Sequence, residues 1–137
     1  MKKSYTVSAL LIAAFFAFSY CNPPAKASGR VFFTEPADGA VIEGKVKVMM
    51  GVEGMEVKPA GELVEGTGHH HIIINGSSVE KGMVVPADEK YIHFGKGQTE
   101  TELELEPGEY SLTLQFANGL HESYGPDLSQ TIKITVK

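Results

Sequence analysis

From residue 30 to residue 137, short runs of alternating polar and apolar residues are separated by turns that contain glycine or proline. Successive side chains of a β-strand point to opposite faces, so such runs predict strands that bury one face. Apolar residues do not recur at helical spacing over a dozen residues here, which predicts an all-β domain. We expect strands over residues 30–34, 45–52, 69–75, 91–94, 100–106, 110–116 and 131–137, with a short one near 55–57.

About seven strands, each with one apolar face, are typical of an antiparallel sandwich of two sheets with immunoglobulin-like architecture. The clean alternation argues against a parallel sheet that is covered on both faces. The chain has one Cys and no Trp, so the cysteine pair and buried tryptophan of true immunoglobulin domains are absent. The prediction therefore concerns the architecture and leaves the strand order open. We expect residues 28–137 to form a single β-sandwich domain.

The N-terminus has the pattern of an export signal. Lys2 and Lys3 precede an uncharged apolar stretch over residues 9–18, and Ala25-Lys26-Ala27 offers a cleavage site before Ser28. This combination predicts a signal peptide over residues 1–27. The apolar stretch is shorter than the roughly 20 residues that a transmembrane helix needs, which disfavours a retained anchor.

Cys21 offers a second processing route, because a cysteine that follows the apolar stretch can be lipidated. Phe18 and Tyr20 are bulky where such sites favour small residues. Both routes place the domain outside the cytoplasm, in the periplasm or the extracellular space. In the lipidated form a lipid anchor at Cys21 would be the contact with a membrane.

Without residues 1–27 the chain has 9 basic and 17 acidic residues, a formal charge of −8. Nucleic acids and anionic membrane surfaces are therefore disfavoured as partners, because both need a basic face. A cation or a cationic partner fits this charge better. The acidic residues can equally serve only to keep an exported domain soluble.

Five histidines lie in the predicted domain, and three of them are consecutive: His69, His70, His71, His93 and His121. On a strand His69 and His71 share one face, and imidazole is the most common metal ligand in proteins. His121 is the first candidate for a third ligand to copper or zinc. We name His70, His93 and Met55 as alternates. The simpler interpretation is that each histidine is a structural residue with a hydrogen-bonded ring.

A loop rich in polar residues over 118–126 contains Glu122 and Tyr124 and is a candidate binding loop. No Gly-x-Ser-x-Gly elbow or nucleophile–base pair is visible, so the sequence favours binding over catalysis. Residues 95–99 lack the full spacing of a phosphate-binding loop. The alternating glutamates of residues 100–106 are typical of a solvated strand face at a sheet edge.

Several segments of the chain resemble the bacterial domain-of-unknown-function 4399 family. They are Gly66 to His71, Phe94 to Glu100, Leu114 to His121 and Tyr124 to Pro126, joined by Val31 to Pro36 and Gly51 to Met55. The resemblance implies a small secreted or lipid-anchored bacterial domain with no assigned activity. It also implies that His69, His70, His71, His121 and Tyr124 occupy motif positions, without giving them a role.

The sequence therefore predicts an exported binding module of the cell envelope that takes a transition metal through its histidines. A metal-free domain with a structural or protein-binding role in the envelope is the alternative. A small redox metalloenzyme is a third hypothesis, since a histidine-rich strand invites comparison with superoxide dismutases. The expected partners are a metal ion or an envelope protein.

Overall fold

The computed structural model describes residues 29–137. The predicted signal peptide, its boundary after residue 27 and the alternative lipidation site Cys21 lie outside the described residues. Nine strands and one short 3-10 helix, η1, form the described part. The strands are β1 (Arg30–Glu35), β2 (Ala40–Ile42), β3 (Val46–Glu53), β4 (Glu56–Val57), β5 (Thr67–Ile74), β6 (Tyr91–His93), β7 (Glu100–Leu103), β8 (Gly108–Ala117) and β9 (Ser129–Val136), and η1 spans Pro126–Leu128. No helix within residues 29–137 is long and apolar enough to cross a membrane.

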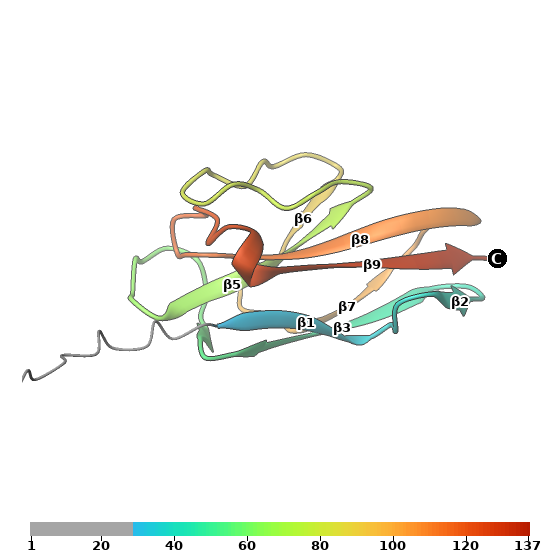
Figure 1. Ribbon diagram of the computed structural model, residues 1–137, viewed down its shortest axis with the longest axis horizontal. Helices are drawn as coiled ribbons and strands as arrows, with labels where there is room; N and C mark the ends of the chain where they lie inside the picture. Colours follow the sequence, from blue (N-terminus) through green and yellow to red (C-terminus); the bar gives the residue numbers. More distant parts are fainter. Residues whose placement is uncertain (1–28) are drawn as a thin grey trace, which may run out of the picture.

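The strands form two sheets, which confirms the all-β class. The smaller sheet has the order β1-β3-β7 and is antiparallel. The larger sheet has the order β2-β9-β8-β5-β4, and β6 also pairs with β5. Figure 1 shows β1 and β3 running along one side of the β8–β9 pair, as in a sandwich.

The prediction of purely antiparallel sheets is wrong. β2 pairs with β9 in parallel, and β4 pairs with β5 in parallel, so the larger sheet is mixed. β4 lies where the sequence predicts a short strand near 55–57, whereas β2 is not predicted. With two and three residues, neither strand is long enough for alternation to reveal its direction. β2 is thus the strand within residues 29–137 that the sequence does not predict, and it brings the number of strands there to nine.

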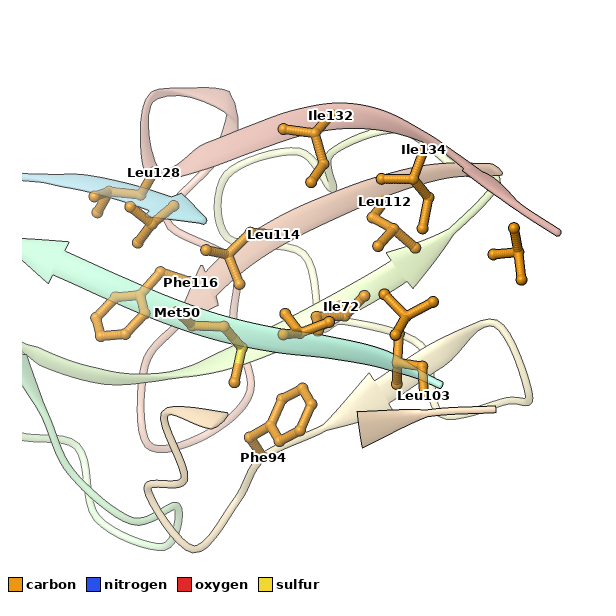
Figure 2. Close-up of a cluster of buried hydrophobic side chains, with 14 residues drawn as sticks. Met50, Ile72, Phe94, Leu103, Leu112, Leu114, Phe116, Leu128, Ile132 and Ile134 are labelled. Carbon is orange, nitrogen blue, oxygen red and sulfur yellow. The ribbon is translucent and has the colours of Figure 1, made fainter. Parts of the chain in front are cut away.

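The core lies between the sheets and follows the alternation. Alternate apolar residues of β8 and β9 are buried and face the smaller sheet, as Leu112, Leu114 and Ile132 do. Met50 of β3 meets them from the opposite side (Figure 2). Burial of such side chains stabilises the fold by roughly 1.5–3 kcal/mol each relative to exposure.

The other face of the larger sheet is also covered, which the alternation does not predict. Residues 75–90 form a long connection that lies on the outer side of β8 (Figure 1). Its Val79 N–H donates to Gln115 Oε1 at 3.0 Å, and the Gly76 carbonyl accepts from Thr113 Oγ1 at 2.8 Å. Gln115 and Thr113 are fully buried as a result. His69 and His71 of β5 lie on this covered face.

Candidate metal centre

β5 places its three histidines on two different faces. In the register with β8, His70 lies opposite Phe116, whereas His69 and His71 lie opposite Ala117 and Gln115. His70 therefore faces the core, and its ring contacts that of Phe116 at a centroid separation of 5.0 Å. His69 and His71 point to the outer face, with ring centroids 4.7 Å apart. Both are buried, at 0% and 2% exposure.

The short strand β6 adds a fourth histidine to the outer face. In the antiparallel pair of β5 and β6, His93 lies directly opposite His71. Directly opposed residues project to the same side of a sheet, so these two rings meet at a centroid separation of 5.0 Å. Because β6 is at the edge of the sheet, His93 is exposed to solvent. It forms the open side of the cluster.

The turn after β8 supplies His121. Asn118 holds this turn, because its Oδ1 accepts the N–H groups of Leu120 at 2.9 Å and Glu122 at 3.0 Å. His121 itself lies in the left-handed region at φ 67°. Its carbonyl accepts the N–H of Val85 at 2.9 Å, so the outer connection fixes the turn from the other side.

Three of the four rings, those of His69, His93 and His121, meet through their Nε2 atoms. His93 Nε2 lies 3.1 Å from His69 Nε2 and 3.1 Å from His121 Nε2. One ligand atom from each of His69, His71 and His93 lies within 4.8 Å of the others. A tetrahedral ion with bonds of about 2.0–2.1 Å separates its ligand atoms by ~3.3 Å. The spacing in this cluster is therefore close to that of a metal site.

The environment keeps the buried rings neutral. Burial, followed by the charges of His93 and His121, lowers the pKa of His69 from 6.5 to about 4. Burial and the neighbouring histidines lower the pKa of His71 to about 3. Burial and the charge of His121 also lower the pKa of His93. A neutral imidazole offers a lone pair, which is the form that binds a metal.

The nitrogens on the far side of the buried rings have no partners. His69 Nδ1 and His71 Nδ1 are buried and make no hydrogen bond within the described residues. In most metal sites the second nitrogen of a ligating histidine donates to a carboxylate or a carbonyl. This cluster departs from that pattern at both buried rings.

Two of the alternates from the sequence lie away from the cluster. His70 is in the core, with both ring nitrogens buried and unpartnered in the described structure. Burial lowers its pKa to about 4. Met55 packs against the hydrophobic core beside Gly29. Strand alternation explains the position of His70, since residues i and i+1 face opposite ways.

The candidate binding loop serves to build the site. The Tyr124 hydroxyl donates to the Thr67 carbonyl at 2.7 Å, which ties the loop to the start of β5. Burial raises the pKa of Tyr124. A carboxylate oxygen of Glu122 accepts the side-chain N–H of Asn118 at 2.8 Å. Both side chains therefore bond to the framework around His121.

The sequence favours His121 over His93 as the third ligand, whereas both short Nε2 contacts involve His93. The signal for His93 was present in the short apolar run of residues 91–94. The sequence does not predict that His93 pairs with His71. The long connection of residues 75–90 between β5 and β6 does not specify which residues of the two strands lie opposite each other.

The model of the domain of unknown function DUF4399 matches residues 48–137, which include all five histidines. The chain belongs to the DUF4399 family. The matched range begins within β3 and contains β4 to β9. Comparison with curated proteins found no match.

Among solved structures the chain is similar to the endo-β-1,4-mannanase from Thermotoga petrophila, with a TM-score of 0.47 and 17% sequence identity. The similarity covers 80% of this chain and 20% of that chain. The chain thus spans about a fifth of the length of the mannanase chain.

Proposed function

We propose that this DUF4399 domain binds a transition metal ion, copper or zinc, through His69, His71, His93 and His121. The observation that carries the proposal is the convergence of Nε2 atoms, with two pairs at 3.1 Å. Imidazole nitrogens suit copper and zinc, whereas calcium and magnesium require oxygen ligands. Two buried and two accessible rings leave a path by which an ion enters the cluster.

Hydrogen bonding alone explains the cluster less well. A neutral imidazole has one N–H and one acceptor nitrogen, so it can satisfy both only with two partners. His69 and His71 each keep a buried Nδ1 without one. Burying each Nδ1 without a partner costs about 1–3 kcal/mol. An ion bound on the Nε2 side would leave these atoms unpartnered, but its binding energy would offset the cost.

We further propose that the domain acts outside the cytoplasm, in the periplasm or the extracellular space. The support for this part is the signal-like pattern of Lys2, Lys3 and residues 9–18 in the sequence. A metal-binding domain of the cell envelope is consistent with the acidic charge.

Isothermal titration with Cu(II), Cu(I) and Zn(II) tests the metal proposal, on protein expressed from the full-length gene and purified as the cell processes it. We expect one ion per chain with micromolar or tighter affinity, and at least a tenfold loss in His69→Ala and His93→Ala. His70→Ala is the matched control from the same strand and should retain binding. Absence of binding at millimolar metal by a folded protein would make the cluster a structural element.

A further inference from the structure

The four rings of the cluster surround a central point in three dimensions. Five of their six centroid separations lie between 4.7 and 5.0 Å, and the separation of His71 and His121 is 6.2 Å. A square arrangement would have two long diagonals. A flat arrangement with these five separations would place His71 and His121 much farther apart than 6.2 Å. The set is therefore closer to a tetrahedron than to a plane.

This shape discriminates between metal ions. Cu(II) favours square-planar or tetragonal ligand sets. An ion with a filled d shell, such as Zn(II) or Cu(I), has no such preference and accepts a tetrahedral set. The arrangement of the rings thus favours Zn(II) and Cu(I) over Cu(II).

The charge of the ligand set discriminates between these two. Each imidazole is a neutral ligand, and no carboxylate within residues 29–137 joins the group of candidate ligands. The acid nearest in sequence to His121 is Glu122, and one of its carboxylate oxygens accepts a hydrogen bond from Asn118 at 2.8 Å. A bound ion would therefore keep its full charge.

Keeping that charge is costly where water is excluded. His69 and His71 are 0% and 2% exposed, so an ion between them loses part of its hydration. The cost of removing an ion from water rises with the square of its charge, and it is about four times larger for a divalent ion than for a monovalent one. His69 Nδ1 and His71 Nδ1 have no acceptors, and such acceptors would make the ligating rings more basic. Their lack therefore also disfavours a divalent ion relative to a monovalent one.

We infer that the cluster selects monovalent copper, Cu(I), over Zn(II) and Cu(II). The inference rests on the proposed metal-binding function and names the ion. It combines the tetrahedral arrangement, the neutral ligand set and the burial of His69 and His71.

Competition titrations test the selectivity on the full-length gene product. Cu(I) is added anaerobically against a chromophoric Cu(I) chelator, and Cu(II) and Zn(II) are each added against a chelator of known affinity. We expect Cu(I) to bind at least tenfold more tightly than either divalent ion. Relative to free copper, a tenfold preference for Cu(I) over Cu(II) raises the reduction potential of bound copper by about 59 mV.

A pair of variants at His93 isolates the effect of charge. His93→Asp adds an anionic oxygen to the ligand set, and His93→Asn adds a neutral one of similar size. Because His93 is exposed at the sheet edge, neither change disturbs the core. We expect the ratio of Cu(I) to Zn(II) affinity to be at least tenfold lower in His93→Asp than in His93→Asn.

The outcomes separate the two claims. Tighter binding of Zn(II) or Cu(II) than Cu(I) by the unmodified protein would overturn this inference and leave metal binding intact. Equal ratios in the two variants would overturn the charge argument. Failure of all three ions to bind would overturn the proposed function and this inference together.

Discussion

His121 has a backbone conformation that residues with a Cβ atom rarely adopt, with φ at 67°. Holding a non-glycine residue there costs about 1–3 kcal/mol, which the surrounding structure must offset. Asn118 and Val85 do so through their hydrogen bonds to the turn. The fold therefore keeps His121 beside the three other imidazoles at a cost in stability.

The pair His121→Gly and His121→Ala separates backbone strain from loss of the ring. Both variants remove the imidazole, whereas only glycine adopts a positive φ without penalty. We expect the free energy of unfolding of metal-free His121→Gly to exceed that of His121→Ala by about 1 kcal/mol. Urea denaturation measures the difference. Equal stabilities would show that the turn is not strained.

His70 is a second residue whose burial has a cost. Both of its ring nitrogens are buried without partners in the described structure, and it lies against Phe116 in the core. His70→Leu replaces the ring by an apolar side chain and removes the unsatisfied groups. We expect it to raise the free energy of unfolding at pH 7 by about 1–3 kcal/mol.

Metal titration of the same variant is its control. Because His70 faces away from His69 and His71, the affinity of His70→Leu should stay within about threefold of the unmodified protein. A destabilised variant, or one that loses the metal, would mean that His70 makes a functional contact.

At the scale of elements, β6 is the least protected part of the cluster. It has three residues and pairs with β5 alone. The His93 ring lies over Gly95, where a Cβ atom would overlap the ring at Cε1 and Nε2. Glycine at this position therefore allows His93 to face the cluster.

Gly95→Ala consequently tests the site without changing a candidate ligand. The added methyl group should turn the exposed His93 ring away from the cluster, with little effect on the core. We expect metal affinity to fall at least tenfold while the circular dichroism spectrum is unchanged. Lys96→Ala, a change at the neighbouring exposed residue, should leave the affinity unaltered. Unchanged affinity in Gly95→Ala would contradict the central position of His93.

The longer strands were predictable because one apolar face is enough to reveal them. Residues 110–116 and 131–137 alternate cleanly, and the structure has β8 and β9 there. Ala40–Ile42 has three residues, so its pairing with β9 depends on tertiary packing that no local pattern encodes. The glutamate-rich run of residues 100–106 is paired only to Leu103, at the edge of the smaller sheet.

Strand alternation also made part of the site predictable. The alternation on β5 places His69 and His71 together and His70 apart. The position of His93 depends on the register of β6, and that of His121 depends on the turn held by Asn118. Both involve contacts between segments distant in sequence, which a pattern of period two does not contain.

At the scale of the whole molecule, the buried histidines make stability depend on pH. The pKa values of His69 and His70 are about 4, and that of His71 is about 3, against an ordinary value of 6.5. Between pH 6.5 and about 4 the unfolded chain therefore binds more protons than the folded chain. The free energy of unfolding should fall as the pH decreases through this range, by up to ~1.4 kcal/mol per pH unit for each group.

Urea denaturation of the metal-free protein at pH 7.0, 5.5 and 4.5 measures this dependence. His70→Leu removes one of the three groups, so its loss of stability over the same range should be smaller. A free energy of unfolding that is constant from pH 7.0 to 4.5 would contradict the burial of these rings in the folded state.

The central claim is that one metal ion lies among four imidazoles contributed by β5, β6 and the turn after β8. Anomalous diffraction at the copper edge, from crystals of the protein grown anaerobically with Cu(I), tests it most directly. We expect one anomalous peak within about 2.0–2.2 Å of nitrogens from at least three of His69, His71, His93 and His121. Crystals with full copper in the solution and no peak between these rings would contradict it.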